Sequence, residues 1–229
     1  MPLRALADGA GQSIVWRLGQ ALAEYDYIKD PDEIYRRSFA TVEAEADLDR
    51  FDARQRQVVK RLIHTCGLVE LAERVAISNQ ALEAGITALQ ASKPIISDVA
   101  MVQAGITQAI TNRCPRVCTL NDPNVPELAT TRSARAVELW QPHLAGAIVA
   151  IGNAPTALFH LLERLEAGWP KPGLVVAMPV GFVGAAESKD ALIAAEDLGL
   201  DYITVTGRMG GSALAAAAVN ALGFLAASC

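Results

Sequence analysis

His64 has the clearest potential for acid–base chemistry in this chain of 229 residues, and Arg61 precedes it by three positions. Imidazole can donate and regain a proton near neutral pH, and a guanidinium can hold a negatively charged ligand. The helical periodicity of residues 57–71 places both side chains on one arc with Leu68 and Leu71, away from the aliphatic stripe that we expect to face the core. Such an arc suits the wall of a ligand cavity or a subunit contact. The alternative is an ordinary surface or hydrogen-bonded helix histidine.

Three glycine-containing turns form a second group of candidate site residues. Each turn joins an aliphatic strand to a helix, and the sequences are I-G-N-A-P-T, M-P-V-G-F-V-G and T-G-R-M-G-G-S. In a parallel sheet such turns meet at the carboxyl edge, where open α/β sheets bind ligands and helix N-termini attract anions. Asn153, Lys189 and Arg208 lie in or after these turns, and we expect them to bind substrate. Facing the helix that holds His64, the turns would form a cavity for an anionic molecule.

The elements that must position these residues begin with three helices, expected at 32–45, 52–75 and 79–91. Strands are then predicted at 94–97, 116–120, 146–151, 173–178 and 202–206, and further helices at 99–110, 128–140, 155–166, 188–198 and 212–226. This alternation predicts a single α/β domain with a mostly parallel sheet of about five strands flanked by helices, preceded by an N-terminal helical portion. We assign residues 25–229 to this domain and residues 1–24 to an N-terminal extension.

Composition and charge argue against several classes of partner. The formal net charge is -5, which argues against a nucleic-acid partner. The alanine-rich run 212–228 contains Asn220 and is too weakly apolar for a membrane span, so we expect a buried helix in a cytoplasmic protein with no membrane partner. The four cysteines lack disulfide or zinc spacing, and no dinucleotide or nucleotide motif is present. No metal and no cofactor are therefore predicted.

Several segments also carry a family resemblance. They read I-Y-R-R-S-F, V-V-K-R-L-I-H-T-C-G, P-I-I-S-D-V-A-M-V-Q-A-G-I, V-A-I-G-N-A-P-T-A-L-F, P-V-G-F-V-G-A-A-E-S-K-D-A-L and G-R-M-G-G-S-A-L. Together they closely resemble the precorrin-8X methylmutase family, which also contains the cobalt-precorrin-8 methylmutases and belongs to cobalamin biosynthesis. The resemblance covers residues 25–222 in order.

The resemblance implies an isomerase that moves a methyl group from C-11 to C-12 of the precorrin-8 macrocycle without a cofactor. The family's catalytic histidine falls on His64, as proton donor or acceptor, and its substrate-contacting serine and arginine fall on Ser38 and Arg61. The carboxylates of the tetrapyrrole substrate would account for the basic residues. The resemblance also implies a homodimer with its active site near the subunit contact. We further expect transient contact with adjacent enzymes of the cobalamin pathway.

Several alternatives stay open at this point. From periodicity alone, Ser38 would be a helix-face serine that bonds a carbonyl one turn back. A non-catalytic corrinoid-binding carrier would need the same cavity, and a transferase with Cys66 as nucleophile would use the same kind of sheet. The motifs fit a metal-free and a cobalt-bound ring equally well.

Overall fold

The computed structural model describes residues 25–227 of the chain. Its contacts divide into two units, residues 1–37 and 38–229, so the boundary falls inside the first helix. The expected N-terminal extension, residues 1–24, lies outside the described residues. All of the predicted site residues belong to the second unit.

Helices and strands alternate through most of the described chain. The α-helices are α1 (Pro31–Glu45), α2 (Ala53–Cys66), α3 (Ala81–Gln90), α4 (Ala100–Gly105), α5 (Gln108–Thr111), α6 (Arg132–Val137), α7 (Pro155–Glu166), α8 (Ala185–Ala194) and α9 (Ser212–Ala227). The strands are β1 (Val75–Ile77), β2 (Ile95–Ser97), β3 (Arg116–Val117), β4 (Ile148–Ile151), β5 (Leu174–Ala177) and β6 (Tyr202–Val205). Short 3-10 helices are η2 (Val69–Arg74), η3 (Glu138–His143) and η4 (Glu196–Leu198).

The strands form one sheet in the order β1-β6-β5-β4-β2-β3. All neighbouring pairs are parallel except β1 and β6, which pair antiparallel with Val75 opposite Val205. The predicted mostly parallel α/β sheet is confirmed, with six strands in place of about five. The strand that was missed is β1, because its three residues V-A-I directly follow a helical pattern and are too few to show a strand period.

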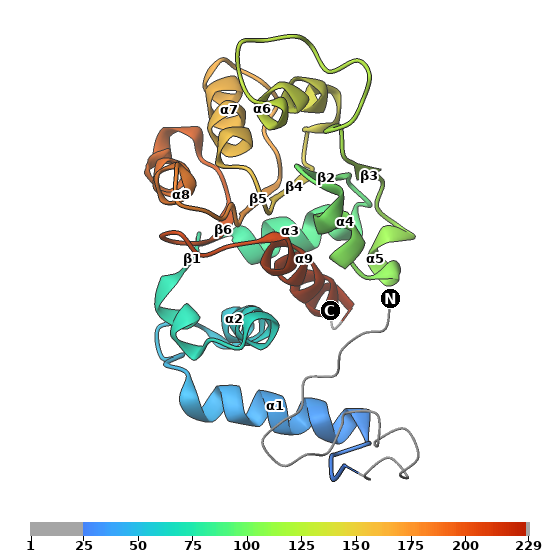
Figure 1. The fold of residues 1–229 in the computed structure, drawn as a ribbon, viewed down its shortest axis with the longest axis vertical. Helices are drawn as coiled ribbons and strands as arrows, with labels where there is room; N and C mark the ends of the chain where they lie inside the picture. The colour runs from blue at the N-terminus through green and yellow to red at the C-terminus, as the bar shows by residue number, and fades with distance from the viewer. Residues whose placement is uncertain (1–24, 228–229) are drawn as a thin grey trace, which may run out of the picture. The chain divides into compact units, whose positions relative to one another are not determined.

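Helices cover both faces of the sheet (Figure 1). Along β4, Val149 and Ile151 point into a core formed with α6, α7 and α8, while Ile148 and Ala150 point into the opposite core with α3, α4 and α9. Side chains alternate along a strand, so an all-aliphatic run such as β4 is buried on both faces, as a parallel sheet requires. α2 packs against α9 and adds a further layer outside it.

α9 is apolar around most of its circumference and is buried accordingly. It contacts α2, α3 and α4 as well as strands β4 and β5. The buried helix predicted for residues 212–226 is therefore confirmed. No helix in the described part of the chain is long and apolar enough to cross a membrane.

The helix predicted for residues 52–75 ends much earlier than expected. Asp52 caps its start by accepting two backbone N–H groups of the first turn, and Gly67 ends it in the left-handed conformation with φ of 72°. The chain then continues as η2 and β1, and Leu71 is fully buried in the core instead of lying beside His64. The prediction was wrong here because the apolar spacing of V-E-L-A-E-R continues the helical period across the glycine.

The segment predicted as one helix over 99–110 is also divided, into α4 and α5. Asn220 of α9 holds the break, since its Oδ1 accepts from the N–H of Thr107 at 2.9 Å and its Nδ2 donates to the carbonyl of Gly105 at 2.8 Å. Such side chain–backbone bonds compete with the helical ladder. Elsewhere the predicted elements differ mainly at their ends: strand 116–120 shortens to β3, helix 128–140 begins at 132 as α6, and helix 188–198 becomes α8 followed by η4.

Candidate active site

His64 and Ser38 form a hydrogen-bonded pair that joins α2 to α1. Ser38 Oγ lies 2.8 Å from His64 Nδ1, although the two residues are 26 positions apart in the sequence. Ser38 is partly buried, whereas His64 is exposed in the last turn of α2, just before Gly67. The structure thus brings together two predicted site residues. The Ser38 hydroxyl contacts the imidazole and not a carbonyl of its own helix, and the periodicity of α1 could not indicate this contact.

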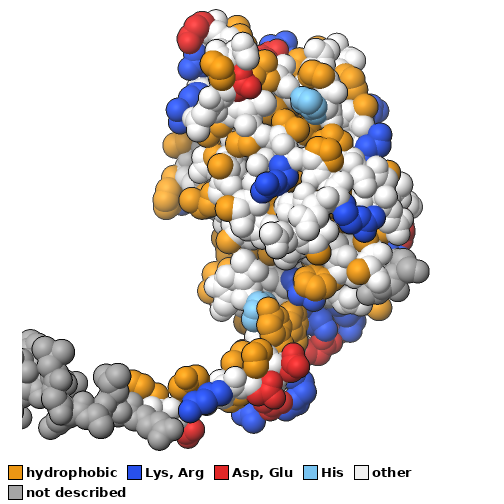
Figure 2. Space-filling model, turned by 90° about the vertical axis from the view of Figure 1, so that its right-hand side faces the viewer, with side chains coloured by type: hydrophobic (Ala, Val, Ile, Leu, Met, Phe, Trp, Pro, Cys, Tyr) orange, Lys and Arg blue, Asp and Glu red, His pale blue; other side chains and the backbone are white. Residues whose placement is uncertain are grey.

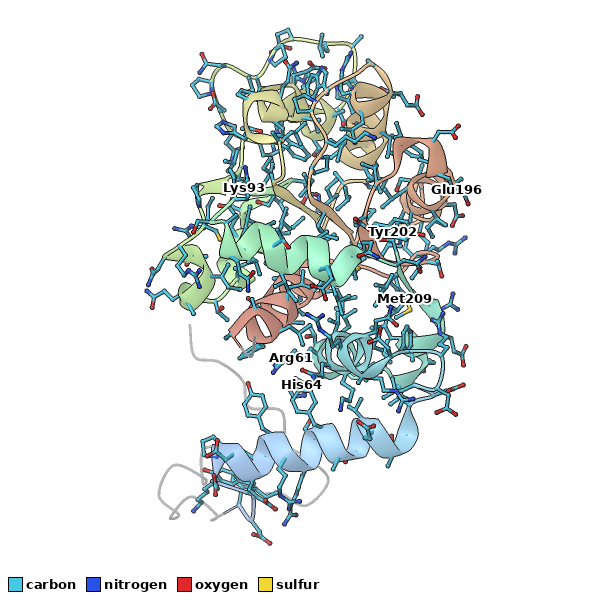
Figure 3. The ribbon with its side chains drawn as sticks, turned by 180° about the vertical axis from the view of Figure 1, so that it is seen from behind. Arg61, His64, Lys93, Glu196, Tyr202 and Met209 are labelled. Atoms are coloured by element: carbon cyan, nitrogen blue, oxygen red, sulfur yellow. The ribbon has the colours of Figure 1, made fainter. Side chains whose placement is uncertain are left out.

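Phe39 and Phe224 complete a group with Ser38, Arg61 and His64 that we call the His64 cluster. The Phe39 ring stacks on the imidazole, with ring centroids 5.2 Å apart and an interplanar angle of 17°. The Arg61 guanidinium carbon lies 3.8 Å from the Phe224 ring centroid and 5.5 Å from that of Phe39, within the range of cation–π attraction. Arg61 and His64 extend from the same side of α2 (Figure 3). Neither phenylalanine was predicted as a site residue, because a phenylalanine at a helical position usually indicates core packing.

A shallow cavity of about 260 Å³ opens beside the Ser38–His64 pair. Its lining comes from α1, the last turn of α2 and the start of η2, and comprises Ser38, Thr41, Val42, Glu45, Ile63, His64, Gly67 and Val69. The imidazole therefore faces a space that a ligand can enter, while its Nδ1 is held from α1.

Contacts within the second unit hold α1 against α2 at this point. Lys60 Nζ lies 2.5 Å from Glu43 Oε2, and Val42 is buried in the core. The hydrogen bond and the charge of Lys60 lower the pKa of Glu43. On α2, Val58, Leu62 and Ile63 are buried, which fixes the side of the helix on which Arg61 and His64 must emerge.

The three glycine-containing turns meet at the carboxyl edge of the sheet, as predicted. The N–H of Gly211 donates to the carbonyl of Met178 at 2.8 Å, and the N–H of Gly181 donates to the carbonyl of Arg208 at 3.3 Å. These bonds join the turn between β5 and α8 to the turn between β6 and α9. Part of the backbone hydrogen-bonding capacity at this edge is thus used to hold the turns to one another.

Asp98 fills the anion-binding position at the same edge. Its carboxylate accepts hydrogen bonds from the N–H groups of Gly152, Asn153 and Ala154 at 2.9, 2.9 and 2.8 Å. It does so between β2 and β4, where the strand order reverses and open sheets usually bind ligands. The side chain is buried, and burial raises the pKa of Asp98 while the three hydrogen bonds oppose the rise. The N–H groups expected to attract a ligand are therefore already bound by the protein itself.

Lys189 and Arg208 differ in what they can offer a ligand. Lys189 is fully buried on α8, and its Nζ donates to the carbonyl of Met209 at 2.6 Å. Burial lowers the pKa of Lys189 from 10.5 to about 8. Arg208 is exposed, with its guanidinium carbon 5.3 Å from the centroid of the Phe182 ring. Arg208 thus faces solvent, as Asn153 does, whereas Lys189 ties α8 to the β6–α9 turn.

α9 separates this edge from the His64 cluster. Ser212 begins α9 next to the edge, and Phe224 lies twelve residues later, which is about 18 Å of helix at 1.5 Å per residue. Figure 3 draws Met209, in the β6–α9 turn, well apart from the two labelled residues of the His64 cluster. The turn residues do not line the cavity beside His64. The structure therefore does not bring Asn153, Lys189 and Arg208 together with His64 within one chain, and their role in substrate binding stays a prediction.

The His64 cluster contains an imidazole, which can exchange protons, and a guanidinium, which can bind an anion. The described residues contain no group of three or more His, Cys, Asp or Glu side chains that could hold a metal ion. Hydrophobic and basic side chains are interspersed over the face shown in Figure 2.

The fold and the His64 cluster together define an α/β protein with an exposed histidine held by a serine and flanked by a guanidinium and two aromatic rings. A sequence model of the precorrin-8X methylmutase family matches residues 33–225. The chain is 50% identical over 209 residues to the precorrin-8X methylmutase of Sinorhizobium sp, covering 88% of this chain and 98% of the relative. It is 52% identical over 202 residues to that of Pseudomonas aeruginosa, covering 86% and 97%.

Other relatives agree with these matches. The cobalt-precorrin-8 methylmutase of Priestia megaterium is 38% identical over 204 residues, covering 86% of this chain and 89% of the relative. A solved structure of the precorrin-8X methylmutase from Thermus thermophilus superimposes with a TM-score of 0.79 at 37% identity, covering 86% and 97%. The chain belongs to the precorrin-8X methylmutase family, which confirms the family predicted from the sequence.

Proposed function

We propose that this chain moves a methyl group from C-11 to C-12 of the precorrin-8 macrocycle, with His64 as proton donor and acceptor. The observation that carries the proposal is the 2.8 Å contact between Ser38 Oγ and His64 Nδ1 at a cavity open to solvent. Family membership supports the reaction class. The reaction is an isomerisation, since one carbon–carbon bond breaks and another forms within the same molecule, and no electron acceptor is required.

Ser38 suits a histidine that must both give and take a proton. A serine hydroxyl can donate to Nδ1 or accept from Nδ1–H, so it stabilises either neutral tautomer of the imidazole. A carboxylate in its place could only accept, so it would hold the proton on Nδ1 and stabilise the imidazolium. With Nδ1 engaged by Ser38, the nitrogen that exchanges a proton with the macrocycle is Nε2.

The remaining members of the His64 cluster match the two properties of a tetrapyrrole that carries acetate and propionate groups. The Arg61 guanidinium offers a planar set of N–H donors for a carboxylate. The rings of Phe39 and Phe224 offer aromatic surface to the conjugated macrocycle, and their contacts with His64 and Arg61 restrict how those side chains can turn.

Proton transfer would select the tautomer from which the methyl group migrates. Methyl migration around a conjugated ring is allowed as a sigmatropic shift once the π-system has the right arrangement of double bonds. His64 donates a proton from Nε2 to the macrocycle, the methyl group moves from C-11 to C-12, and the imidazole regains a proton when the product tautomer forms. Holding the ring in one orientation supplies the rest of the rate enhancement.

The test is to incubate the purified protein with precorrin-8X and to follow absorbance and mass by chromatography. Catalytic formation of a new chromophore at unchanged mass is the expected result, and the product would be hydrogenobyrinate. A spectral change limited to one ring per site, without further turnover, would instead favour the alternative, a non-catalytic corrinoid-binding carrier. Absence of any response to either the metal-free or the cobalt-bound ring would overturn the proposal.

Several finer features belong to the same proposal. The identities of 50% and 52% to precorrin-8X methylmutases, against 38% to a cobalt-precorrin-8 methylmutase, favour the metal-free ring, with cobyrinate as product if cobalt is present. The family resemblance supports a homodimer that acts in the cytoplasm, with residues 25–229 as its methylmutase domain. It also supports transient contact with neighbouring enzymes of the pathway. Light scattering on the purified chain would test the homodimer.

A further inference from the structure

A second cavity, separate from the one beside His64, lies between the C-terminal ends of α3 and α9 and the short helix α5. Its volume is about 230 Å³, and most of its lining is apolar. Leu89, Ile110 and Ala226 contribute aliphatic surface, and Phe224 contributes an aromatic wall. Its polar members, which include Gln90, Thr107 and Arg113, are few. An apolar cavity with a few polar groups is the usual form of a small-molecule site.

Specific contacts within the chain build this cavity. Asn220 bonds the backbone of Gly105 and Thr107 and so fixes the break between α4 and α5 that forms one wall. Gly223 lets α5 approach α9 closely, because a Cβ at that position would lie 2.5 Å from Cδ1 of Ile110. The cavity is therefore a preformed part of the fold.

Phe224 joins this cavity to the His64 cluster. Its ring lines the cavity, and the Arg61 guanidinium carbon lies 3.8 Å from the ring centroid. Arg61 in turn stands one helical turn from His64 on α2. A flat ligand held at His64 and Arg61 would thus reach the cavity across a single aromatic side chain.

Arg113 supplies positive charge to this apolar cavity. It is exposed, and within residues 25–227 no carboxylate pairs with its guanidinium. A guanidinium beside apolar walls is complementary to an apolar ring that carries a carboxylate on a short side chain. The cavity is too small for a whole tetrapyrrole, but it can take the edge of one pyrrole ring with its substituents.

We propose that this cavity is a subsite for the tetrapyrrole, which receives the edge of one pyrrole ring while Arg113 binds the carboxylate of that ring's acetate or propionate group. The inference rests on the proposed function and adds to it a site whose wall includes Phe224, the aromatic partner of Arg61. It assigns Arg113 to binding and the cavity walls to orientation of the macrocycle over His64.

Two variants with matched controls test the subsite. Arg113→Met removes the charge and is compared with Arg116→Met, an exposed arginine of β3 that does not line the cavity. Ala109→Phe fills the cavity from α5 and is compared with Ala104→Phe, an exposed alanine of α4 outside it. Binding of hydrogenobyrinate is titrated by absorbance at two salt concentrations, turnover of precorrin-8X is measured with the same proteins, and circular dichroism verifies folding.

Arg113→Met should weaken hydrogenobyrinate binding about 10-fold, the low end for a hydrogen bond between charged groups, and should reduce the salt dependence of binding. Its kcat should stay within about 2-fold, since the charge acts on binding and not on proton transfer. Ala109→Phe should raise the KM by a similar factor, and both controls should behave as the wild type.

Wild-type binding by both Arg113→Met and Ala109→Phe, in a protein that still converts precorrin-8X, would overturn the subsite and leave the proposed function intact. Loss of self-association by Ala109→Phe with unchanged hydrogenobyrinate binding would also overturn it, because a second copy would then cover the cavity. A wild-type protein that neither binds nor converts the ring would instead reject the proposed function.

Discussion

The carboxyl edge of the sheet and the His64 cluster use polar groups in opposite ways. At the edge, the Asp98 carboxylate is buried and bonded to three backbone N–H groups, and the Lys189 ammonium is buried against the carbonyl of Met209. In the His64 cluster the imidazole is exposed, and its hydroxyl partner Ser38 lines the same open cavity. Asp98 and Lys189 at the edge are thus bound within the protein, whereas the imidazole of His64 is exposed.

The difference follows from the cost of burying charge. A buried ionised group without partners is strongly destabilising, so it must be paired or hydrogen-bonded by the protein. Asp98 and Lys189 meet that requirement by fixing turns, which leaves them little capacity for a ligand. A group that exchanges protons with a substrate must be accessible, and the side chain of His64 is exposed.

His64→Ala should give the largest loss of activity and the sharpest test of this comparison. Removing a general acid or base typically costs about 10²–10⁴-fold in rate, and turnover of precorrin-8X should fall by this factor. The thermal midpoint should change little, because the side chain is exposed. Arg208→Ala is the matched control at the edge and should alter kcat only a few-fold. Equal losses in the two variants would place the edge in the same reaction site as His64.

Asp98→Ala should give the largest loss of stability. It leaves three backbone N–H groups without their acceptor, and each such group costs about 1–3 kcal/mol when water cannot replace the bond. We expect the free energy of unfolding to fall by about 3 kcal/mol or more, measured by urea denaturation. Asp197→Ala, at an exposed aspartate of η4, should change it by less than about 0.5 kcal/mol. Similar small changes in both variants would show that water replaces the carboxylate as the acceptor for these N–H groups.

The sequence predicted the regular parts of this fold well because their signals are local. α7 was predicted at 155–166 and occupies Pro155–Glu166, since a proline fits its first turn and apolar residues repeat at the helical period. The central strands were found because each is a short aliphatic run between turn residues. The end of α2 was missed because it depends on the left-handed conformation of Gly67. β1 was missed because it depends on pairing with β6, which lies far along the chain.

The candidate site was predictable only in part for the same reason. His64 and Arg61 share an arc that helical periodicity can show, but the family resemblance was needed to assign Ser38. Asp98 gave no local signal, because its three partners lie 54 to 56 residues away. The expected cavity between the turns and the His64 helix assumed that all polar groups near a sheet edge face one ligand. Packing of α9 between the two regions sets them apart instead.

The pH dependence of stability in Lys189→Met should distinguish a structural role of Lys189, which holds the turn, from a role in substrate binding. The folded pKa is about 8 and the ordinary value is 10.5, so between these pH values the unfolded chain binds more protons at this residue. The unfolding free energy of the wild type should therefore rise with pH across this window, by up to about 3 kcal/mol relative to the variant. Lys171→Met, at an exposed lysine, should keep the wild-type profile. A variant profile parallel to the wild type, with a raised KM at pH 7, would favour substrate binding by Lys189.

Ser38→Ala should give the smallest of these effects and tests the hydrogen bond between Ser38 and His64. Loss of the hydroxyl leaves Nδ1 of His64 to water, which costs about 1–1.5 kcal/mol for a hydrogen bond of this kind, or roughly 10-fold in turnover. The pH profile of kcat should change as well, because the hydroxyl no longer stabilises the two imidazole tautomers. Ser38→Thr keeps the hydroxyl and should recover most of the activity. Wild-type turnover and an unchanged pH profile of kcat in Ser38→Ala would show that the reaction does not require the hydrogen bond from Ser38 to His64.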